Sequence, residues 1–432
     1  MKMNDMILVS VDDHFVEPPD MFDAHIPAAY KDKAPKIIQD QGSDFWVYEG
    51  KKLPNIGLNA VVGRPPEEYG VEPAAFDQMR KGVWSVKERV DDMNANGVLG
   101  SLGFPTFPGF AGMLFTGATD KEAANVIIKA YNDWHIDEWC GAAPGRFIPI
   151  CILPLWSPEL MVSEINRVAR KGVTTISFPD NPAAKGLPSI HSSYWDPVWR
   201  AMSDWGMVIS AHIGTGAAAP HASMESPIDA WITTMPMSIS NSAADWLFSS
   251  VFKKFPKLKL ALSEGGIGWI PYLLERADFT YRHHRAWTHS NFGNELPSDV
   301  FNRHFITCFI DDQFGLKNTE SLNTNMVMWE CDYPHSDTLW PKCPEHLWDS
   351  IKHLSQDQID AMTHKNAMRE YRFDPFAVLA REKCTVGALR ESAKDVDVSV
   401  KFNMGGHDPR EGRKDQVTSG DVAKLFVAAV DE

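Results

Sequence analysis

The sequence is short of three things: paired cysteines, long hydrophobic runs and basic residues. Its six cysteines include no C-x-x-C pair, and several lie inside apolar runs, where free thiols pack as small hydrophobes. We therefore expect a reduced, cytoplasmic protein. No apolar run approaches about 18 residues and the first residues do not resemble a signal peptide, so we expect neither a membrane span nor a targeting segment.

The net charge of -15 means that acidic residues outnumber basic ones. Nucleic acids and anionic membranes are recognised mainly through excess lysine and arginine, so neither is an expected partner. A neutral, aromatic or weakly charged small molecule fits this charge better. With 432 residues and 44% hydrophobic side chains, the chain can bury a sizeable core in one large domain or two ordinary ones.

Short apolar, β-rich runs alternate with longer amphipathic runs from about residue 86 onward. Most of the short runs are continuously apolar, as strands buried on both faces should be. Together they predict an α/β fold of the (β/α)₈ type, the TIM barrel. A doubly wound open sheet is the alternative, although no G-x-G-x-x-G follows the first strand. The predicted strands are residues 6–11, 98–104, 147–153, 173–178, 207–212, 258–266, 305–310 and 326–332.

Three segments go beyond a minimal barrel. Residues 13–85, after the first strand, contain DFWVYEG and LNAVVG, which predict a small β-rich insertion. Residues 213–241, after the fifth strand, are rich in methionine and small residues, which favours a lid-like loop. We therefore divide the chain into a barrel over residues 1–373 and a polar C-terminal extension over residues 374–432, which we expect to wrap the surface or contact an oligomer partner.

Functional residues of such barrels lie at the carboxyl ends of the strands, and several predicted strand ends carry metal-ligating side chains. Asp12 and His14 stand at alternate positions of the first strand, so both point to one side. His212, Glu264 and Asp332 end the fifth, sixth and eighth strands. Carboxylates gathered at one barrel mouth would be costly to bury without a cation, so these residues predict a metal site.

Imidazole and carboxylate ligands without a thiolate suit one divalent ion. Zinc is the first expectation, and manganese, iron and cobalt are the alternatives. Such a set does not resemble the closed structural site of a zinc finger. An open coordination position would bind and activate water, or polarise a substrate oxygen.

The stretches that carry these residues resemble a known family. SVDDHFVEPPD, SAHIGTG, FPKLKLALSEGGIGWIPYLLERAD and WECDYPHSD, in this order between residue 6 and about residue 372, are similar to motifs of the amidohydrolase superfamily. The similarity is to its amidohydrolase-related (amidohydrolase 2) family, which includes the aminocarboxymuconate-semialdehyde decarboxylase-like enzymes.

This resemblance implies a set of ligands and one departure. The implied metal ligands are Asp12, His14, His212 and Asp332, and Asp12 replaces the first histidine of the family's common H-x-H. In decarboxylase relatives a histidine at the end of the sixth strand assists catalysis. Glu264 stands at that position here, which disfavours the decarboxylase mechanism.

Four further residues near these motifs have open roles. Glu17 either reaches the metal or a neighbouring arginine, or anchors its own loop beside two prolines. His335 either orients Asp332 or contacts the substrate, or else it is a loop histidine bonded to backbone. We expect supporting roles for Trp269, lining the barrel, and for Arg276, paired with a buried carboxylate, with solvent exposure as the alternative for Arg276.

The leading hypothesis is a metal-dependent hydrolase that cleaves a carbonyl-centred bond (C–N, C–O or C–C) in a small, largely apolar or aromatic substrate. Asp332 would act as general base towards water, and Glu264 or His335 would donate a proton to the leaving group. The alternative is metal-dependent, non-oxidative decarboxylation of an aromatic or unsaturated acid. A catalytically inactive binding barrel ranks third, because every ligand position holds a competent side chain. We also expect a homo-oligomer, a dimer or higher, with some of the 15 tryptophans at its interface.

Overall fold

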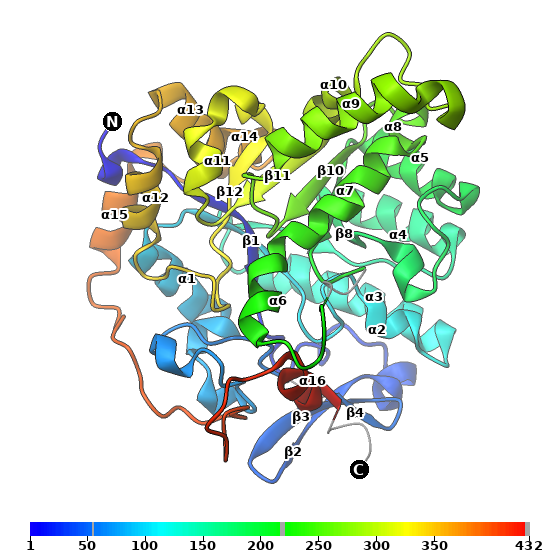
Figure 1. The fold of residues 1–432 in the computed structure, drawn as a ribbon. Coiled ribbons are helices and arrows are strands. Elements are labelled where there is room, and N and C mark those ends of the chain that lie inside the picture. Colours follow the sequence, from blue (N-terminus) through cyan, green and yellow to red (C-terminus); the bar gives the residue numbers. More distant parts are fainter. Residues whose placement is uncertain (54–55, 217–220, 428–432) are drawn as a thin grey trace.

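A closed barrel of parallel strands forms the centre of the molecule in the computed structural model, which describes residues 1–53, 56–216 and 221–427 (Figure 1). Its strands form two hydrogen-bonded sheets, in the orders β1-β5-β6 and β12-β11-β10-β9-β8-β7. β1 meets the segment directly after the last strand, where Asp332 N donates to Asp12 O over 2.8 Å. The (β/α)₈ prediction is confirmed. The barrel strands are β1 (Val9–His14), β5 (Gly100–Phe104), β6 (Phe147–Ile148), β7 (Ile150–Cys151), β8 (Thr175–Pro179), β9 (Val208–His212), β10 (Lys259–Ser263), β11 (Phe305–Phe309) and β12 (Val327–Trp329).

All eight predicted strands differ from the structure in their bounds, and β10 ends at Ser263, one residue before Glu264. Three further differences concern β1, the third predicted strand and β12. β1 starts three residues later than predicted and continues through the acidic stretch to His14. The third predicted strand is divided into β6 and β7 by Pro149, which has no N–H for the sheet ladder. β12 ends at Trp329, and Asp332 has a φ of 55°, which no extended strand can contain.

Amphipathic helices follow the strands and cover the barrel, as their apolar periodicity predicts (Figure 1). In α4 the Ser157 hydroxyl accepts a hydrogen bond from Leu160 N over 3.3 Å and Pro158 occupies the first helical position, and together they start the helix. The α-helices are α1 (Val86–Asn96), α2 (Met113–Thr116), α3 (Lys121–Trp134), α4 (Pro158–Arg170), α5 (Asp196–Trp205), α6 (Ile228–Thr234), α7 (Ile239–Phe248), α8 (Val251–Lys254), α9 (Ile270–Thr288), α10 (Pro297–His304), α11 (Gln313–Lys317), α12 (Cys343–Ile351), α13 (Gln356–Asp360), α14 (Asn366–Glu370), α15 (Val386–Ser392) and α16 (Ser419–Val427).

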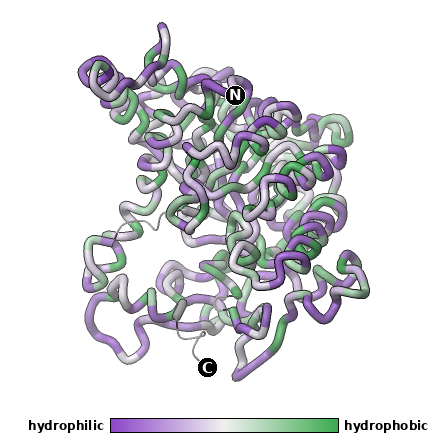
Figure 2. Tube along the Cα trace, turned by 90° about the vertical axis from the view of Figure 1, so that its right-hand side faces the viewer, coloured by the Kyte–Doolittle hydropathy of each residue, from purple (hydrophilic) through white to green (hydrophobic). Residues whose placement is uncertain are grey.

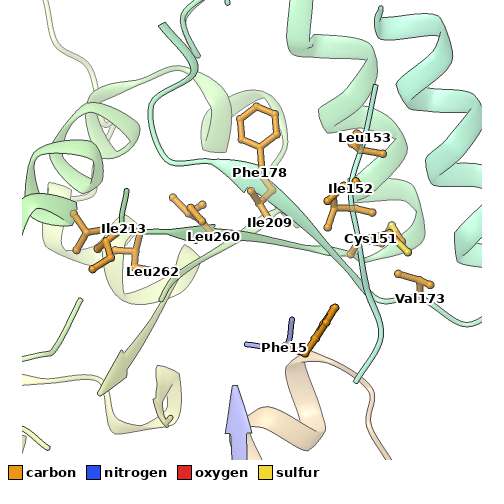
Figure 3. Packing of buried hydrophobic residues seen from close by; sticks show 14 of the residues in the cluster. Phe15, Cys151, Ile152, Leu153, Val173, Phe178, Ile209, Ile213, Leu260 and Leu262 are labelled. Atoms are coloured by element: carbon orange, nitrogen blue, oxygen red, sulfur yellow. The ribbon is translucent and has the colours of Figure 1, made fainter. Parts of the chain in front are cut away.

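The core between barrel and helices is apolar (Figure 3), and it contains many aromatic side chains. Phe178 of β8 makes edge contacts with Trp195 and Trp199, each at a ring-centroid distance of 5.0 Å. Several of the outermost loops are hydrophilic (Figure 2). All six cysteines lie in the described part of the chain, and they are buried and unpaired. Among the described helices, none is long and apolar enough to cross a membrane.

The insertion after β1 contains a small antiparallel sheet of β2 (Lys36–Asp40), β3 (Ser43–Tyr48) and β4 (Lys51–Leu53). The strand predicted at DFWVYEG is therefore present. The strand predicted at LNAVVG is wrong, because Leu58 and Asn59 have φ values of 28° and 58° and interrupt extended backbone. That stretch instead packs against the loop after β12, where Val62 N donates to Pro334 O over 3.0 Å.

The C-terminal extension runs along the outside of the molecule and joins the insertion to the lid-like loop (Figure 1). His407 N donates to Glu72 O in the insertion over 2.8 Å, and Ser419 N donates to Ser226 O in the lid over 2.9 Å. The described part of the lid contains α6. Residues 217–220 of the predicted lid and 428–432 of the predicted extension lie outside the described residues.

Candidate metal centre

Successive polar side chains at the end of β1 point in two directions. Asp12 and His14 are buried among the donor groups at the barrel mouth. Between them, Asp13 accepts hydrogen bonds from Ser10 Oγ and Tyr333 N, each over 3.1 Å. The carboxylate of Asp13 thus fixes the strand end from behind, while its two neighbours remain free for chemistry.

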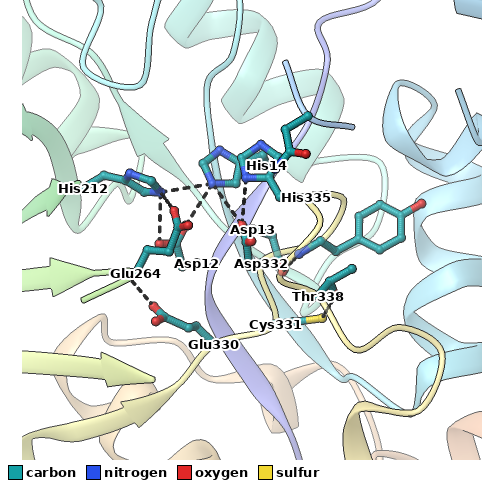
Figure 4. A network of polar contacts seen from close by, with 12 residues as sticks. Asp12, Asp13, His14, His212, Glu264, Glu330, Cys331, Asp332, His335 and Thr338 are labelled. Carbon is teal, nitrogen blue, oxygen red and sulfur yellow. Dashed lines mark hydrogen bonds and ion pairs between the residues drawn. The ribbon is translucent and has the colours of Figure 1, made fainter. Parts of the chain in front are cut away.

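His14 Nε2 lies at the centre of the four predicted metal ligands (Figure 4). It is 3.4 Å from Asp12 Oδ1, 3.5 Å from Asp332 Oδ1 and 3.2 Å from His212 Nε2. His212 Nδ1 lies 2.7 Å from Ile213 O, and this contact turns Nε2 of the same ring towards the cluster. The structure therefore brings Asp12, His14, His212 and Asp332 together.

Two further predicted residues join this cluster. Glu264 Oε2 lies 3.0 Å from His212 Nε2, and the residue has a φ of 58°. His335 Nδ1 lies 2.9 Å from Asp332 Oδ1, and its ring stacks on that of His14 with the centroids 3.9 Å apart. The donor atoms form two overlapping groups, namely Asp12, His14, His212 and Glu264, and His14, Glu264, Asp332 and His335.

Without a cation, the buried carboxylates of this cluster are in an unfavourable environment. Whether a metal ion would relieve this cost decides whether the site fits a metal. Both carboxylate oxygens of Asp12, and Oδ2 of Asp332, are buried without a hydrogen-bond partner among the described residues. Burial raises the pKa of Asp12 well above its ordinary value, and the nearby charges of Glu330, Glu264 and Asp332 raise it further. Burial also holds the pKa of His14 well below its ordinary value. Since a divalent cation favours ionised carboxylates and neutral imidazoles, the donor set fits a metal ion.

Glu17 lies away from the donor cluster, and its role in the structure is that of a loop anchor. The buried carboxylate accepts hydrogen bonds from Thr106 N and Phe107 N over 2.9 Å each, and from the Tyr131 hydroxyl over 2.7 Å. Burial raises the pKa of Glu17 to about 7, although these three bonds lower it. Glu17 therefore anchors a loop, but this is the loop after β5 and not its own, as one alternative expected.

The other two predicted supporting residues differ in their positions. The Trp269 indole Nε1 donates to Gly265 O over 2.7 Å, so it braces the loop directly after Glu264. Arg276 is exposed on α9, with its guanidinium 4.8 Å from the centroid of the Phe279 ring. The structure does not bring Arg276 to the centre, and the expected pairing with a buried carboxylate is wrong.

Two residues at the centre were missing from the sequence prediction. Glu330 is fully buried and its Oε2 accepts a hydrogen bond from Glu264 N over 3.2 Å. Its place two residues before Asp332 was an available signal, because alternate residues of an extended segment share a side. Phe110 lies in the loop after β5, with its ring centroid 4.4 Å from that of His212. No sequence pattern indicated this contact.

The match to known proteins agrees with this geometry. A family model described as amidohydrolase matches residues 22–373, which is most of the chain. The chain belongs to the amidohydrolase family. The resemblance inferred from the sequence motifs is confirmed, and the matched region contains His212, Glu264 and Asp332.

The individual relatives share little sequence identity with this chain. The chain is 22% identical over 304 residues to a 2-amino-3-carboxymuconate-6-semialdehyde decarboxylase of Dictyostelium discoideum, covering 69% of this chain and 80% of that protein. Among solved structures, an amidohydrolase from Mycobacterium avium subsp. paratuberculosis has a TM-score of 0.62 at 18% identity, over 84% of this chain and 99% of its own. A 5-carboxyvanillate decarboxylase from Novosphingobium aromaticivorans, with bound manganese, has a TM-score of 0.61 at 15% identity, over 85% of this chain and 97% of its own. At these identities the structures establish the shared fold.

Proposed function

We propose that this amidohydrolase-family enzyme is a metal-dependent, non-oxidative decarboxylase of an aromatic or unsaturated carboxylic acid. The observation that carries the proposal is the buried donor cluster, which includes two acid–base groups, Glu264 and the Asp332–His335 pair. The decarboxylase names of the Dictyostelium relative and the manganese-bound neighbour favour this reaction over the hydrolysis that we expected first.

Asp12, His14, His212 and Asp332 would hold the ion. A bound divalent ion would position oxygen atoms of the substrate and draw electron density from them. Zinc was the first expectation, but oxygen and imidazole donors also suit manganese, the metal in the Novosphingobium structure.

Decarboxylation replaces a carboxylate by a proton at the same carbon, so the enzyme must deliver one proton for each carbon dioxide released. Glu264 lies in the donor cluster at the end of β10 and can hold that proton on its carboxyl group. His335, paired with Asp332 on the other side of His14, is the second group able to hold it. A carboxyl at the strand-six position can therefore take the acid role that a histidine has in decarboxylase relatives.

Metal content and carbon dioxide release test this proposal together. We expect elemental mass spectrometry to find about one divalent ion per chain in the parent protein and little in His212→Ala. The metal-loaded parent should release carbon dioxide from one or more phenolic or unsaturated acids, and His212→Ala should not. A parent protein that takes up no zinc, manganese, iron or cobalt on reconstitution would contradict the proposal.

A further inference from the structure

One partly exposed aromatic side chain covers the imidazoles of the donor cluster. The ring centroid of Phe110 lies 4.4 Å from that of His212, 4.6 Å from that of His14 and 6.1 Å from that of His335. The imidazole rings themselves are buried. Phe110 is therefore a partly exposed side chain in direct contact with the rings that carry the donor atoms.

The loop that carries Phe110 is held in place at both of its ends. Glu17 accepts hydrogen bonds from the backbone N–H groups of Thr106 and Phe107, and the Ser177 hydroxyl donates to Phe110 O. Between these contacts the chain turns, with Gly109 N donating to Thr106 O over 3.0 Å. A buried carboxylate and a turn thus fix the ring relative to the donors, as a binding wall requires.

The structure assigns to Phe110 the role of the wall against which a planar, unsaturated ring of the substrate packs, with Glu17 as the residue that positions its loop. This inference rests on the proposed function, because it takes an aromatic or unsaturated acid as the ligand. Aromatic rings prefer offset or edge contacts with centroids about 4.5–7 Å apart, and such a pair adds affinity beyond the area that it buries. A saturated ring of the same size gains affinity from the area that it buries, but it does not gain the additional affinity of an aromatic pair.

The test compares two probes that share one metal-binding group and have no carboxylate to lose, phenylphosphonate and cyclohexylphosphonate. Calorimetry on the manganese-loaded protein gives the ratio of their dissociation constants. In Phe110→Leu this ratio should move towards the saturated phosphonate by roughly two- to tenfold, the size of one aromatic pair. Phe110→Tyr, which keeps the ring, should retain the parent ratio.

Phe107→Leu is the matched control in the same loop, because the Phe107 ring stacks on Trp46 at 4.5 Å and not on the histidines. It should keep the parent ratio and the parent metal content. Equal ratios in the parent and Phe110→Leu, or no binding of phenylphosphonate to the metal-loaded parent, would overturn the inference. Carbon dioxide release is measured separately: if it is absent while the ratio shifts as expected, the proposed function fails and the role of Phe110 stands.

Discussion

The backbone of Glu264 has a left-handed conformation, which is uncommon for a residue with a side chain. Its N–H donates to Glu330 Oε2 over 3.2 Å, while its own carboxylate lies 3.0 Å from His212 Nε2 (Figure 4). The direction of the Glu264 side chain therefore depends on a second buried carboxyl group, below the donor cluster.

Removing that acceptor should impair the reaction without removing the metal. Glu330→Leu leaves the Glu264 N–H without a partner, which costs about 1–3 kcal/mol, so we expect kcat to fall by roughly ten- to a hundredfold. Glu330→Gln keeps an oxygen acceptor and should stay within a few-fold of the parent. The measurements are steady-state kinetics and metal content. Equal loss in both variants would show that Glu330 does not act through this hydrogen bond.

The pKa of Glu17 gives a prediction for stability. Because burial raises this pKa from 4.5 to about 7, the folded state holds the proton more tightly than the unfolded state. The resulting stability is fully present below about pH 4.5 and is lost as the pH rises through 7, a change on the order of 3 kcal/mol. Urea unfolding at pH 5 and pH 8 should show a smaller difference in Glu17→Gln than in the parent. Identical differences would contradict the assigned shift.

At the scale of elements, continuous apolar strands and amphipathic helices made the barrel predictable. Asp12, His14, His212 and Asp332 were predictable as well, because parallel strands bring their carboxyl ends to one face. Contacts between loops that are far apart in sequence could not be predicted. Phe110 lies within a loop without a distinctive pattern, and the hydrogen bond from Glu264 to Glu330 joins segments that follow two different strands.

The C-terminal extension provides an element-scale prediction through Ser419. Its N–H donates to Ser226 O in the lid, and Ser419 is the first residue of α16, where proline is tolerated. Ser419→Pro removes this donor together with the hydroxyl, so we expect a lid that opens more often. The KM should rise by roughly two- to tenfold, the worth of one hydrogen bond, and the segment 221–241 should be cleaved faster by protease.

Ser419→Ala is the control for this substitution, since it keeps the N–H and removes a hydroxyl that has no hydrogen-bond partner among the described residues. It should behave as the parent does in both measurements. If the proline and alanine variants are alike in KM and in protease sensitivity, the hydrogen bond from Ser419 N to Ser226 O does not hold the lid.

For the whole molecule, the donor cluster joins β1, β9, β10 and the segment after β12, so a bound ion should stabilise the closed barrel. An ion at a thousand times its Kd contributes about 4 kcal/mol, and chelation should therefore lower the Tm by several degrees. His212→Ala should show no such metal-dependent shift. A parent protein with the same Tm before and after chelation would argue against a metal shared by these strands.

The reaction in ¹⁸O-labelled water tests the central claim most directly, with phenolic acids and their methyl esters and anilides offered to the metal-loaded protein. Mass spectrometry follows the organic products, and infrared detection follows carbon dioxide. The account predicts that acids lose carbon dioxide to give products without ¹⁸O, while the esters and anilides remain intact. Uptake of ¹⁸O into cleaved esters or anilides, with every acid unchanged, would identify a hydrolase and contradict the decarboxylase.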